Sequence, residues 1–530
     1  MKTVLTCLLL AVAIEVPVLA QTVSAEDDGT DLKEIIIFGR HSIRAPTSSD
    51  ADMDQYAADP YPAFIDPGSG TVSNGILTLH GKQAEGLLGA YFREYLLHEG
   101  LLTGTTNDLA RTYFRANVIE RSYMTAARFG AGLITNGTIP VHTYTPGPTN
   151  ADPVFDPLWA MQVTVDAARA LAEVQALFGS GTNISSAYSN ELSLIRKALY
   201  PPGTQPTNAP PQQGSVDPTT LLTSFQTNPP PYFTGDVAYL GGLEELVNAA
   251  DPFIMQYADG FSTNDVAWGR LTAEEVSQQT RINTLQIEVA MRMPYLARVQ
   301  SSSAASHILR TMLQSVNGET LAGAFGDTTT QIHVIISSDY YVAGLAGFLD
   351  THWQLPGYQP DFCTPGGALV FELRQVRTTE EYLVRVFYTA QTLDQLRNLT
   401  PLNLANPPAT QQLLIPDGLS TNLDMSFSSF SNLLSQTIDP EYVPSFDTVP
   451  PDVLDNPYLT TNPTNITISV SGETLSIAWP GDHLGWVLQA TTNGLVTPAW
   501  FNLPGTVDLT TVPIPIDPAF SAVFYRLIRP

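Results

Sequence analysis

The sequence predicts an α/β core with a helical insert, followed by a small all-β unit at the C-terminal end. Short apolar runs at residues 35–38, 331–337, 368–374 and 381–388 are too brief for helices. Between them lie longer stretches with helical spacing, and strands separated by helices are typical of an α/β core. After residue 463 the pattern changes to short strands between turn signals, which predicts a β-sandwich.

Length and charge limit the classes of protein that the chain can represent. With 530 residues it is too long for one ordinary domain and long enough to bury a large core. Its 24 Lys+Arg against 51 Asp+Glu give a formal net charge of −27. Such a field repels nucleic acid and anionic membrane surfaces, so both are excluded as main partners. Only 14% of the residues are charged, a balance that favours an extracellular protein.

The first 20 residues have the features of a secretory signal peptide. Lys2 precedes an apolar run, Val4–Ile14, and Val18–Ala20 offers a small-residue cleavage site. A membrane anchor would need about 20 uninterrupted apolar residues, and Glu15 and Pro17 interrupt this run. We therefore expect a secreted or periplasmic protein.

Cysteine usage predicts a fold without an internal disulfide. Cys7 falls within the predicted signal peptide and lacks the small-residue context of a lipoprotein cleavage site. Cys363 is then the one cysteine of the mature chain. A packed thiol is favoured over a reactive one at this position.

The first half of the chain reads as a strand, a loop and a series of helices. A buried strand over 35–38 ends at Gly39, and residues 47–75 read as a loop. A helix over 77–97, a strand over 113–118 and a helix over 120–133 follow. We expect the helical insert at about 150–310, interrupted by a Pro-rich excursion over 200–231. Its predicted helices span 164–178, 190–198, 241–250, 273–292 and 304–316.

The second half returns to strands and then changes character. Prolines are frequent over residues 439–463, and we place a semi-rigid linker at 444–463. The predicted sandwich at 464–530 has strands over 465–470, 474–479, 485–490, 499–503 and 522–528. Trp479, Trp486 and Trp500 are interpreted as core residues of this module rather than ligand contacts.

The chemistry concentrates just past the first strand, at Arg40, His41 and Arg44. In open α/β sheets ligands bind at the carboxyl ends of the strands. Arginine presents a fork of donors that matches phosphate oxygens, and a neutral imidazole can attack phosphorus. The spacing therefore indicates an anion pocket that contains a nucleophile. The alternative on these residues alone is a surface Arg/His cluster.

Arg121 is a further candidate for the anion pocket. It lies in the first turn of the helix predicted over 120–133, where an arginine opposes the helix dipole. Either it forms an ion pair with Glu120, or it joins the backbone amides of that turn in holding an anion.

The segment Arg40–Pro46 resembles the Arg-His-Gly-x-Arg-x-Pro signature of the histidine acid phosphatases, and the chain matches further family segments in order, from about Lys33 to about Val443. The nearest branch is that of the bacterial phytases and glucose-1-phosphatases. The further segments that match the family are Leu77–Lys82, Ala116–Ser122, Asp152–Leu158, Ser338–Asp339, Gly366–Glu372 and Gln391–Leu402.

The resemblance implies a phosphoglycerate-mutase-like mixed sheet flanked by helices and a phosphatase domain over 33–443. It also implies roles. His41 would form a phosphohistidine, and Arg40, Arg44 and Arg121 would neutralise the phosphoryl oxygens. Asp339 would protonate the leaving alkoxide and then activate water. Ser338 stands where the family places a phosphate-binding histidine. The family needs no metal or cofactor for this reaction, and the need for a protonated acid predicts an acidic pH optimum.

Two residues depart from the family pattern. Ser42 replaces the glycine after the histidine, which is harmless if its φ is negative. Ser338 replaces the histidine of a His-Asp motif, and loss of one such donor costs about 10²–10³ in rate in comparable sites. Ser338 could donate a shorter, neutral bond instead.

Other residues could supply the donor that Ser338 lacks or change the shape of that site. His333 lies about 16 Å back along the strand, so it is an unlikely substitute for Ser338. His352 could serve if the intervening helix returns to the site. The pair Tyr340-Tyr341, where the family often has Thr-Asn, could reshape the leaving-group side.

Two hypotheses of function result. The first is a secreted acid phosphomonoesterase that acts on phytate or sugar phosphates, and the second is a weak or inactive relative that binds phosphate esters. Lysine occurs only at Lys33, Lys82 and Lys197 after the predicted signal peptide, and this scarcity favours smaller sugar or other monoesters over phytate. Arg292 and Arg298 are interpreted as members of structural ion pairs. Contact of the C-terminal module with a surface or polymer is a further hypothesis.

Overall fold

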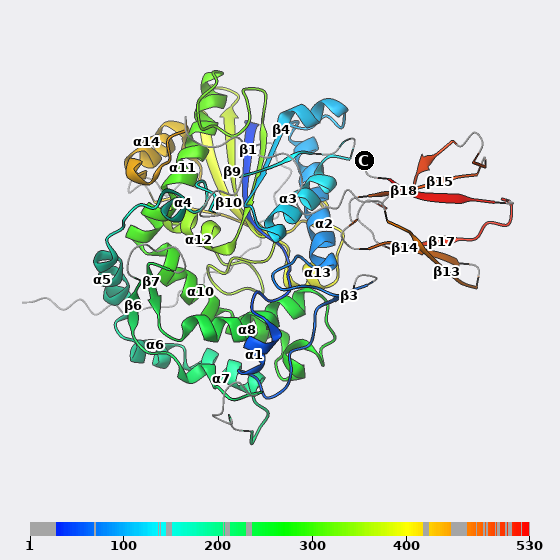
Figure 1. Cartoon of the computed structure of the whole chain (residues 1–530). Helices are drawn as coiled ribbons and strands as arrows, with labels where there is room; N and C mark the ends of the chain where they lie inside the picture. The colour runs from blue at the N-terminus through cyan, green and yellow to red at the C-terminus, as the bar shows by residue number, and fades with distance from the viewer. Residues whose placement is uncertain are drawn as a thin grey trace, which may run out of the picture.

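Figure 1 shows the computed structural model of the chain. Two parts of the chain are described. The described residues are 28–446 without 68–69, 136, 138, 145–150, 205, 207–212, 229–235 and 417–422, and 464–528 without 473, 481–482, 484–485, 493, 496–498, 504–505, 507–510 and 521. The predicted signal peptide and nearly all of the predicted linker lie outside these residues. No helix among the described residues is long and apolar enough to cross a membrane.

A mixed β-sheet forms the centre of the larger part, as the sequence predicts. Its strand order is β11–β10–β9–β1–β8–β4–β5, with β12 beside β10. The strands are β1 (Thr30–Arg40), β4 (Thr112–Ala116), β5 (Val141–Thr143), β8 (Ile332–Ser337), β9 (Ala368–Val376), β10 (Tyr382–Ala390), β11 (Ala409–Gln412) and β12 (Met425–Ser426).

The strands β1, β8 and β4 are parallel neighbours and end at the same edge of the sheet. Arg40, the last residue of β1, is opposite Ser337, the last residue of β8. Ala116, which ends β4, is opposite Ile336. Segments that follow these strands are therefore brought together although they are about 80 and 300 residues apart in the chain.

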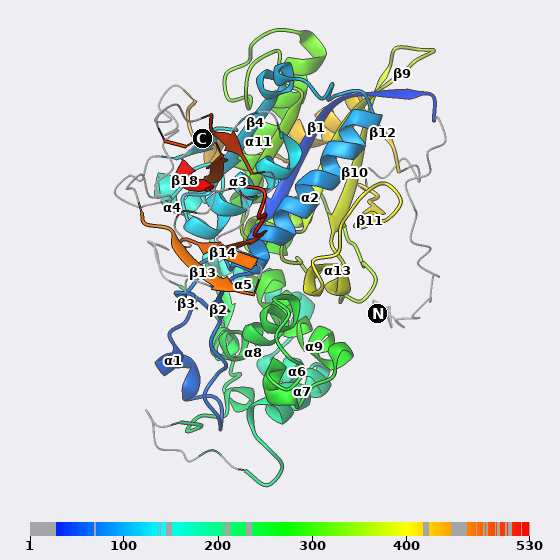
Figure 2. The same ribbon diagram turned by 90° about the vertical axis from the view of Figure 1, so that its right-hand side faces the viewer.

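Helices cover both faces of the sheet, which explains why Ile35–Phe38 in β1 form an unbroken apolar run. Ile35 and Ile37 pack with α2 (Leu79–His98) and α3 (Glu120–Leu133). Ile36 and Phe38 belong to the core that includes α11 (Pro294–Asn317) and α12 (Asp339–Phe348). Figures 1 and 2 show α2 and α3 together on one side of β1. Strand residues that are covered on both faces tend to form a continuous apolar run.

The insert predicted over about 150–310 is largely helical, and its apolar residues join the core beneath the sheet. Figure 1 shows it as a layer below the carboxyl edge of the strands. Its elements are α4 (Pro157–Met161), α5 (Ala167–Phe178), α6 (Gly181–Ala187), α7 (Ser189–Leu199), α8 (Leu243–Ala258), α9 (Ala273–Gln279), α10 (Arg281–Ile287) and the π-helical turn η4 (Glu288–Arg292).

Two predicted helices differ from the observed ones. The single helix predicted over 273–292 is wrong, because α9 ends at Thr280 and a second helix begins there. The helix predicted over 304–316 begins ten residues earlier. Ser301, Ser302 and Ser303 are buried within it, and Ser302 Oγ donates to Arg298 O (2.7 Å), so a polar sequence hides a core helix.

Two segments predicted as irregular contain short elements. The loop predicted over 47–75 carries α1 (Asp50–Asp54) and the pair β2 (Ile65–Asp66) and β3 (Gly70–Thr71). In the Pro-rich interval, β6 (Phe225–Thr227) pairs with β7 (Ala238–Leu240).

The C-terminal part contains two small antiparallel sheets with an apolar cluster between them. One has the order β13–β14–β17 and the other β16–β15–β18. Trp479 is in the cluster and Trp486 is buried, as predicted. The strands are β13 (Thr467–Ser471), β14 (Thr474–Ala478), β15 (Val487–Thr491), β16 (Phe501–Asn502), β17 (Thr511–Pro515) and β18 (Phe524–Ile528).

The strand β17 was not predicted from the sequence. Pro513 and Pro515 lower the strand propensity of this segment, and prolines are tolerated in β-sheets on edge strands. β17 is such an edge strand, since it pairs only with β14 among the described strands of its sheet.

Candidate active site

The loop after β1 is fixed to its neighbours through backbone hydrogen bonds. His41 N donates to Ser337 O (2.8 Å) at the end of β8. Arg40 N donates to Gly367 O (2.8 Å), and Gly366 N donates to His41 O (3.2 Å). The turn before β9 and the end of β8 therefore hold the backbone of Arg40 and His41 from two sides.

The His41 side chain is held in a tautomer suited to nucleophilic attack. Its Nδ1 lies 2.8 Å from Ser42 O, and because a carbonyl oxygen only accepts hydrogen bonds, Nδ1 carries the proton. Nε2 therefore keeps its lone pair. Burial, and then the charges of Arg121, Arg40 and Arg44, hold the pKa of His41 well below its usual range. The imidazole thus stays neutral to a lower pH than a free histidine does.

Three arginines lie close enough to act on His41 through their charge, and two of them are paired with carboxylates. Arg40 is buried, its Nη2 is 3.0 Å from Asp339 Oδ2, and its Nη1 donates to Cys363 O. Arg44 Nη2 is 3.0 Å from Asp251 Oδ2 in α8. The insert thereby supplies a counterion to the loop after β1.

Arg121 comes from the first turn of α3, as predicted. Its Nη1 donates to Gly75 O (3.4 Å), whereas Glu120 Oε2 accepts from Leu77 N (3.0 Å). Burial and then the positive charge of Arg44 lower the pKa of Arg121 to about 10. An anion placed among these guanidinium groups would remove that repulsion.

Asp339 and Ser338 follow the end of β8 at the start of α12. Asp339 Oδ1 accepts from Tyr340 N (3.2 Å), and Oδ2 contacts Arg40. Ser338 is the N-cap residue of α12, but its side chain makes no capping hydrogen bond. Its hydroxyl is therefore not committed to the helix end, and Ser338 is half-buried beside Asp339.

The two histidines that could substitute for the motif histidine contact other residues instead. His333 Nε2 lies 2.9 Å from Glu34 Oε1, near the opposite end of β8. His352 Nδ1 lies 2.7 Å from Asp361 Oδ2 and 3.0 Å from Arg292 Nη2. Neither is brought to His41 by these contacts.

The other basic residues considered for substrate binding are in ion pairs, as predicted. Arg292 Nε lies 3.1 Å from Glu288 Oε2, and Arg298 Nη2 lies 3.2 Å from Asp439 Oδ2. Cys363 is a free, buried thiol whose pKa is raised by burial, in agreement with a packed role.

Backbone geometry explains how Ser42 can replace the family's glycine, one of the two departures from the family pattern. Ser42 has no positive φ, so the family's glycine is not required there for conformational reasons. Its backbone N donates to Thr125 Oγ1 (3.0 Å) in α3.

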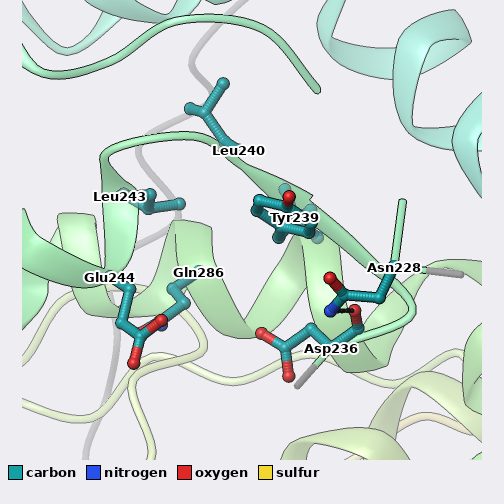
Figure 3. A pocket seen from close by; sticks show the side chains of 8 residues that line it. Asn228, Asp236, Tyr239, Leu240, Leu243, Glu244 and Gln286 are labelled. Carbon is teal, nitrogen blue, oxygen red and sulfur yellow. Dashed lines mark hydrogen bonds between the residues drawn. The ribbon is translucent and has the colours of Figure 1, made fainter. Parts of the chain in front are cut away.

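A polar cavity of about 260 Å³ lies in the insert, and sequence reasoning did not find it. Figure 3 shows the carboxylates of Asp236 and Glu244 on the same side of the cavity as the Gln286 amide. Burial, then Glu244 and Asp156, raise the pKa of Asp236 to about 7. The lining residues are Asn228, Asp236, Tyr239, Leu240, Leu243, Glu244, Gln286 and Val289.

The cavity is linked to Asp339 through the residue that follows it. Burial, then the charges of Asp236, Asp339 and Glu244, raise the pKa of Tyr340 well above its usual range. The charges of Asp339 and of two carboxylates that line the cavity thus all act on the Tyr340 hydroxyl.

No protein-family model matches the chain. In sequence it is 27% identical over 404 residues to phytase AppA of Escherichia coli (strain K12), which covers 76% of this chain and 90% of that protein. It is 24% identical over 449 residues to the glucose-1-phosphatase of Providencia rettgeri, covering 83% of this chain and all of that one. Among solved structures, the Hafnia alvei phytase in complex with tartrate superposes with a TM-score of 0.68 at 26% identity, covering 79% of this chain and 100% of the phytase.

Proposed function

We propose that this chain, a phosphomonoesterase of the histidine acid phosphatase kind related to the bacterial phytases and glucose-1-phosphatases, acts through a phosphohistidine intermediate on His41. The observation that carries the proposal is the state of His41. It is buried, neutral and protonated on Nδ1, and it lies within the electrostatic field of three arginines from two distant parts of the chain. A neutral nucleophile in a cationic pocket is what attack on a phosphate ester requires.

In the first step, His41 Nε2 would attack phosphorus in line with the ester oxygen. A P–N bond forms while the P–O bond to the leaving group breaks. Arg40, Arg44 and Arg121 would stabilise the negative charge on the three other oxygens. Asp339 would give its proton to the departing alkoxide, which leaves as an alcohol.

In the second step, water would release the phosphate. Asp339, now ionised, would accept a proton from the water as its oxygen attacks phosphorus. The P–N bond breaks and His41 is restored as a neutral imidazole. The Arg40–Asp339 contact of 3.0 Å supports this role, because it places the carboxyl beside a phosphate-binding group.

The acidic cavity favours small sugar phosphates over phytate as substrates. Phytate carries further phosphates on its leaving group, and these would come within the field of Glu244, whose charge also acts on Tyr340 next to Asp339. Like charges at close range disfavour binding. A sugar carries hydroxyl groups instead, and these can donate hydrogen bonds to carboxylate and amide oxygens.

Kinetics on three substrates in acid buffer with chelator test the proposal. We expect turnover of p-nitrophenyl phosphate, and a higher kcat/KM for glucose 1-phosphate than for phytate. In Glu244→Gln, kcat/KM for phytate should rise about threefold because one like charge is removed, while p-nitrophenyl phosphate is unaffected. Glu274→Gln, which changes an exposed acid on α9, is the matched control.

Absence of turnover of all three substrates would contradict the function, and preference for phytate in the parent would contradict only the substrate choice.

Ser338→His should increase the rate. A histidine at this position would add an ionisable donor beside Asp339, and donors of this kind are worth about 10²–10³ in comparable sites. We expect at least about a tenfold gain in kcat/KM for p-nitrophenyl phosphate. Ser338→Ala is the companion variant and should lower it by less than that. A loss of rate in Ser338→His would indicate that the serine is already the better donor here.

The alternative of a weak or inactive relative rests on Ser338 and is tested by the same kinetics. Secretion or a periplasmic location, proposed for this chain, is supported by the sequence of residues 1–20. The boundaries of the domains and a surface or polymer contact through residues 464–530 also stay predictions.

A further inference from the structure

One buried acid next to the nucleophile loop has no part in the proposed reaction. Glu85 lies in α2 and is 1% exposed. A carboxyl group buried this deeply is normally ionised only if it is paired with a cation. Its position beside the loop that carries His41 therefore requires an explanation.

The surroundings of Glu85 connect it to that loop at two points. One is Gly366, whose φ is +71° and whose backbone N donates to His41 O. A Cβ atom on Gly366 would overlap Glu85 Oε1, so the carboxyl lies directly against this turn. The other is Ser42, which follows His41 and whose carbonyl fixes the His41 tautomer.

The charge state of Glu85 follows from these neighbours. Burial raises its pKa to about 8, and the Ser42 hydroxyl counters part of that rise. Neither Glu85 Oε1 nor Ser42 Oγ has a hydrogen bond of ordinary geometry, although both atoms are buried. A protonated carboxyl and a hydroxyl can each donate and accept, so the two can satisfy one another without a cation.

We propose that Glu85 is a positioning residue. As a neutral carboxylic acid, it holds Ser42 and the turn at Gly366 in place on either side of His41. The inference rests on the proposed function for its kinetic readout. It explains why a serine is accepted where the family has glycine, because the hydroxyl gains a buried partner in α2. Glu85 itself touches none of the reacting atoms in this role.

Kinetics on p-nitrophenyl phosphate separate the neutral acid from a charged or merely space-filling group. Glu85→Gln keeps size and hydrogen bonding without ionisation, so kcat should stay within about threefold of the parent. Glu85→Leu should lower kcat at least about tenfold with little change in KM, because the loop loses its position and not its phosphate contacts. Ser42→Gly should lower kcat in the parent but have a smaller effect in Glu85→Leu, as expected for coupled residues.

Thermal unfolding gives a second readout that does not depend on turnover. The pKa of Glu85 is higher in the folded chain (about 8) than its ordinary value of 4.5. The folded state therefore holds the proton more tightly, and this contribution is full below about pH 4.5 and is lost as the pH rises toward 8. Between pH 5 and pH 8 the Tm of the parent should fall more than the Tm of Glu85→Gln.

The control is Glu372→Gln, which removes another buried acid, opposite Ile35 of β1 and away from His41. It should change Tm but leave kcat as in the parent. The proposal is overturned if Glu85→Gln is as damaging to kcat as Glu85→Leu, or if its Tm falls in parallel with the parent. Should Glu85→Leu fail to fold, Glu85→Gln decides alone. A parent without turnover would contradict the proposed function, while the Tm comparison would still test the state of Glu85.

Discussion

Replacing His41 with alanine should lower kcat for p-nitrophenyl phosphate at least about 10³-fold, which is the largest effect expected of any single substitution in this chain. The imidazole is the group held neutral by burial and by three arginines. Without it, the cationic pocket remains but nothing can form a covalent bond to phosphorus. The variant should therefore still bind inorganic phosphate.

Two measurements check this expectation. Rapid mixing with radiolabelled substrate, followed by alkaline denaturation, should leave label on the parent and none on His41→Ala, because phosphohistidine survives alkali better than acid. His352→Ala, a histidine paired with Asp361, is the matched control and should retain parental kcat. Equal labelling of His41→Ala and the parent would remove His41 as the nucleophile.

Asp339→Asn should give the second largest effect, and the effect should depend on the leaving group. The amide keeps the size of the side chain beside Arg40 but cannot give up a proton as an acid does. General acid catalysis is typically worth 10²–10⁴-fold, so kcat/KM for glucose 1-phosphate should fall by about that factor. For p-nitrophenyl phosphate, whose leaving group needs no proton, kcat/KM should fall about tenfold or less.

The ratio of these two losses is the decisive quantity for Asp339. The parameter kcat/KM reports the steps up to the first P–O cleavage, so later hydrolysis does not obscure it. Tyr340→Phe provides a control at the neighbouring position, whose hydroxyl is acted on by the charges of Asp236 and Glu244. Equal losses on both substrates would show that Asp339 orders the site and does not act as the acid.

The sheet and the convergence of the motif could be predicted because both depend on local sequence. The run Ile35–Phe38 is apolar at every position, and strands of that kind are buried on both faces. Arg40 and His41 stand at the end of β1, and Asp339 is two residues past the end of β8, so parallel pairing of these strands is enough to bring them together. Arg121 needed only the boundary of one helix, and α3 begins where the sequence predicts.

The parts that could not be predicted depend on contacts between distant segments. Asp251 belongs to no recognisable sequence motif. Only the packing of α8 under the sheet places it against Arg44. Glu85 occupies a position on α2 whose environment is set by Gly366, about 280 residues later. The predicted helix over 304–316 is too short because Ser301–Ser303 look like polar surface in the sequence, whereas they are buried and Ser302 bonds to its own helix.

The carboxylates of Asp339 and Asp251 give two of the site's arginines, Arg40 and Arg44, counterions from within the protein. Each guanidinium is already matched by an anion, at 3.0 Å from Asp339 and 3.0 Å from Asp251. A phosphate that enters must share or replace these partners, so its affinity is lower than three unpaired cations would give. When hydrolysis ends, the same carboxylates compete with the product for the arginines. In the proposed reaction, this competition would promote release of inorganic phosphate and limit product inhibition.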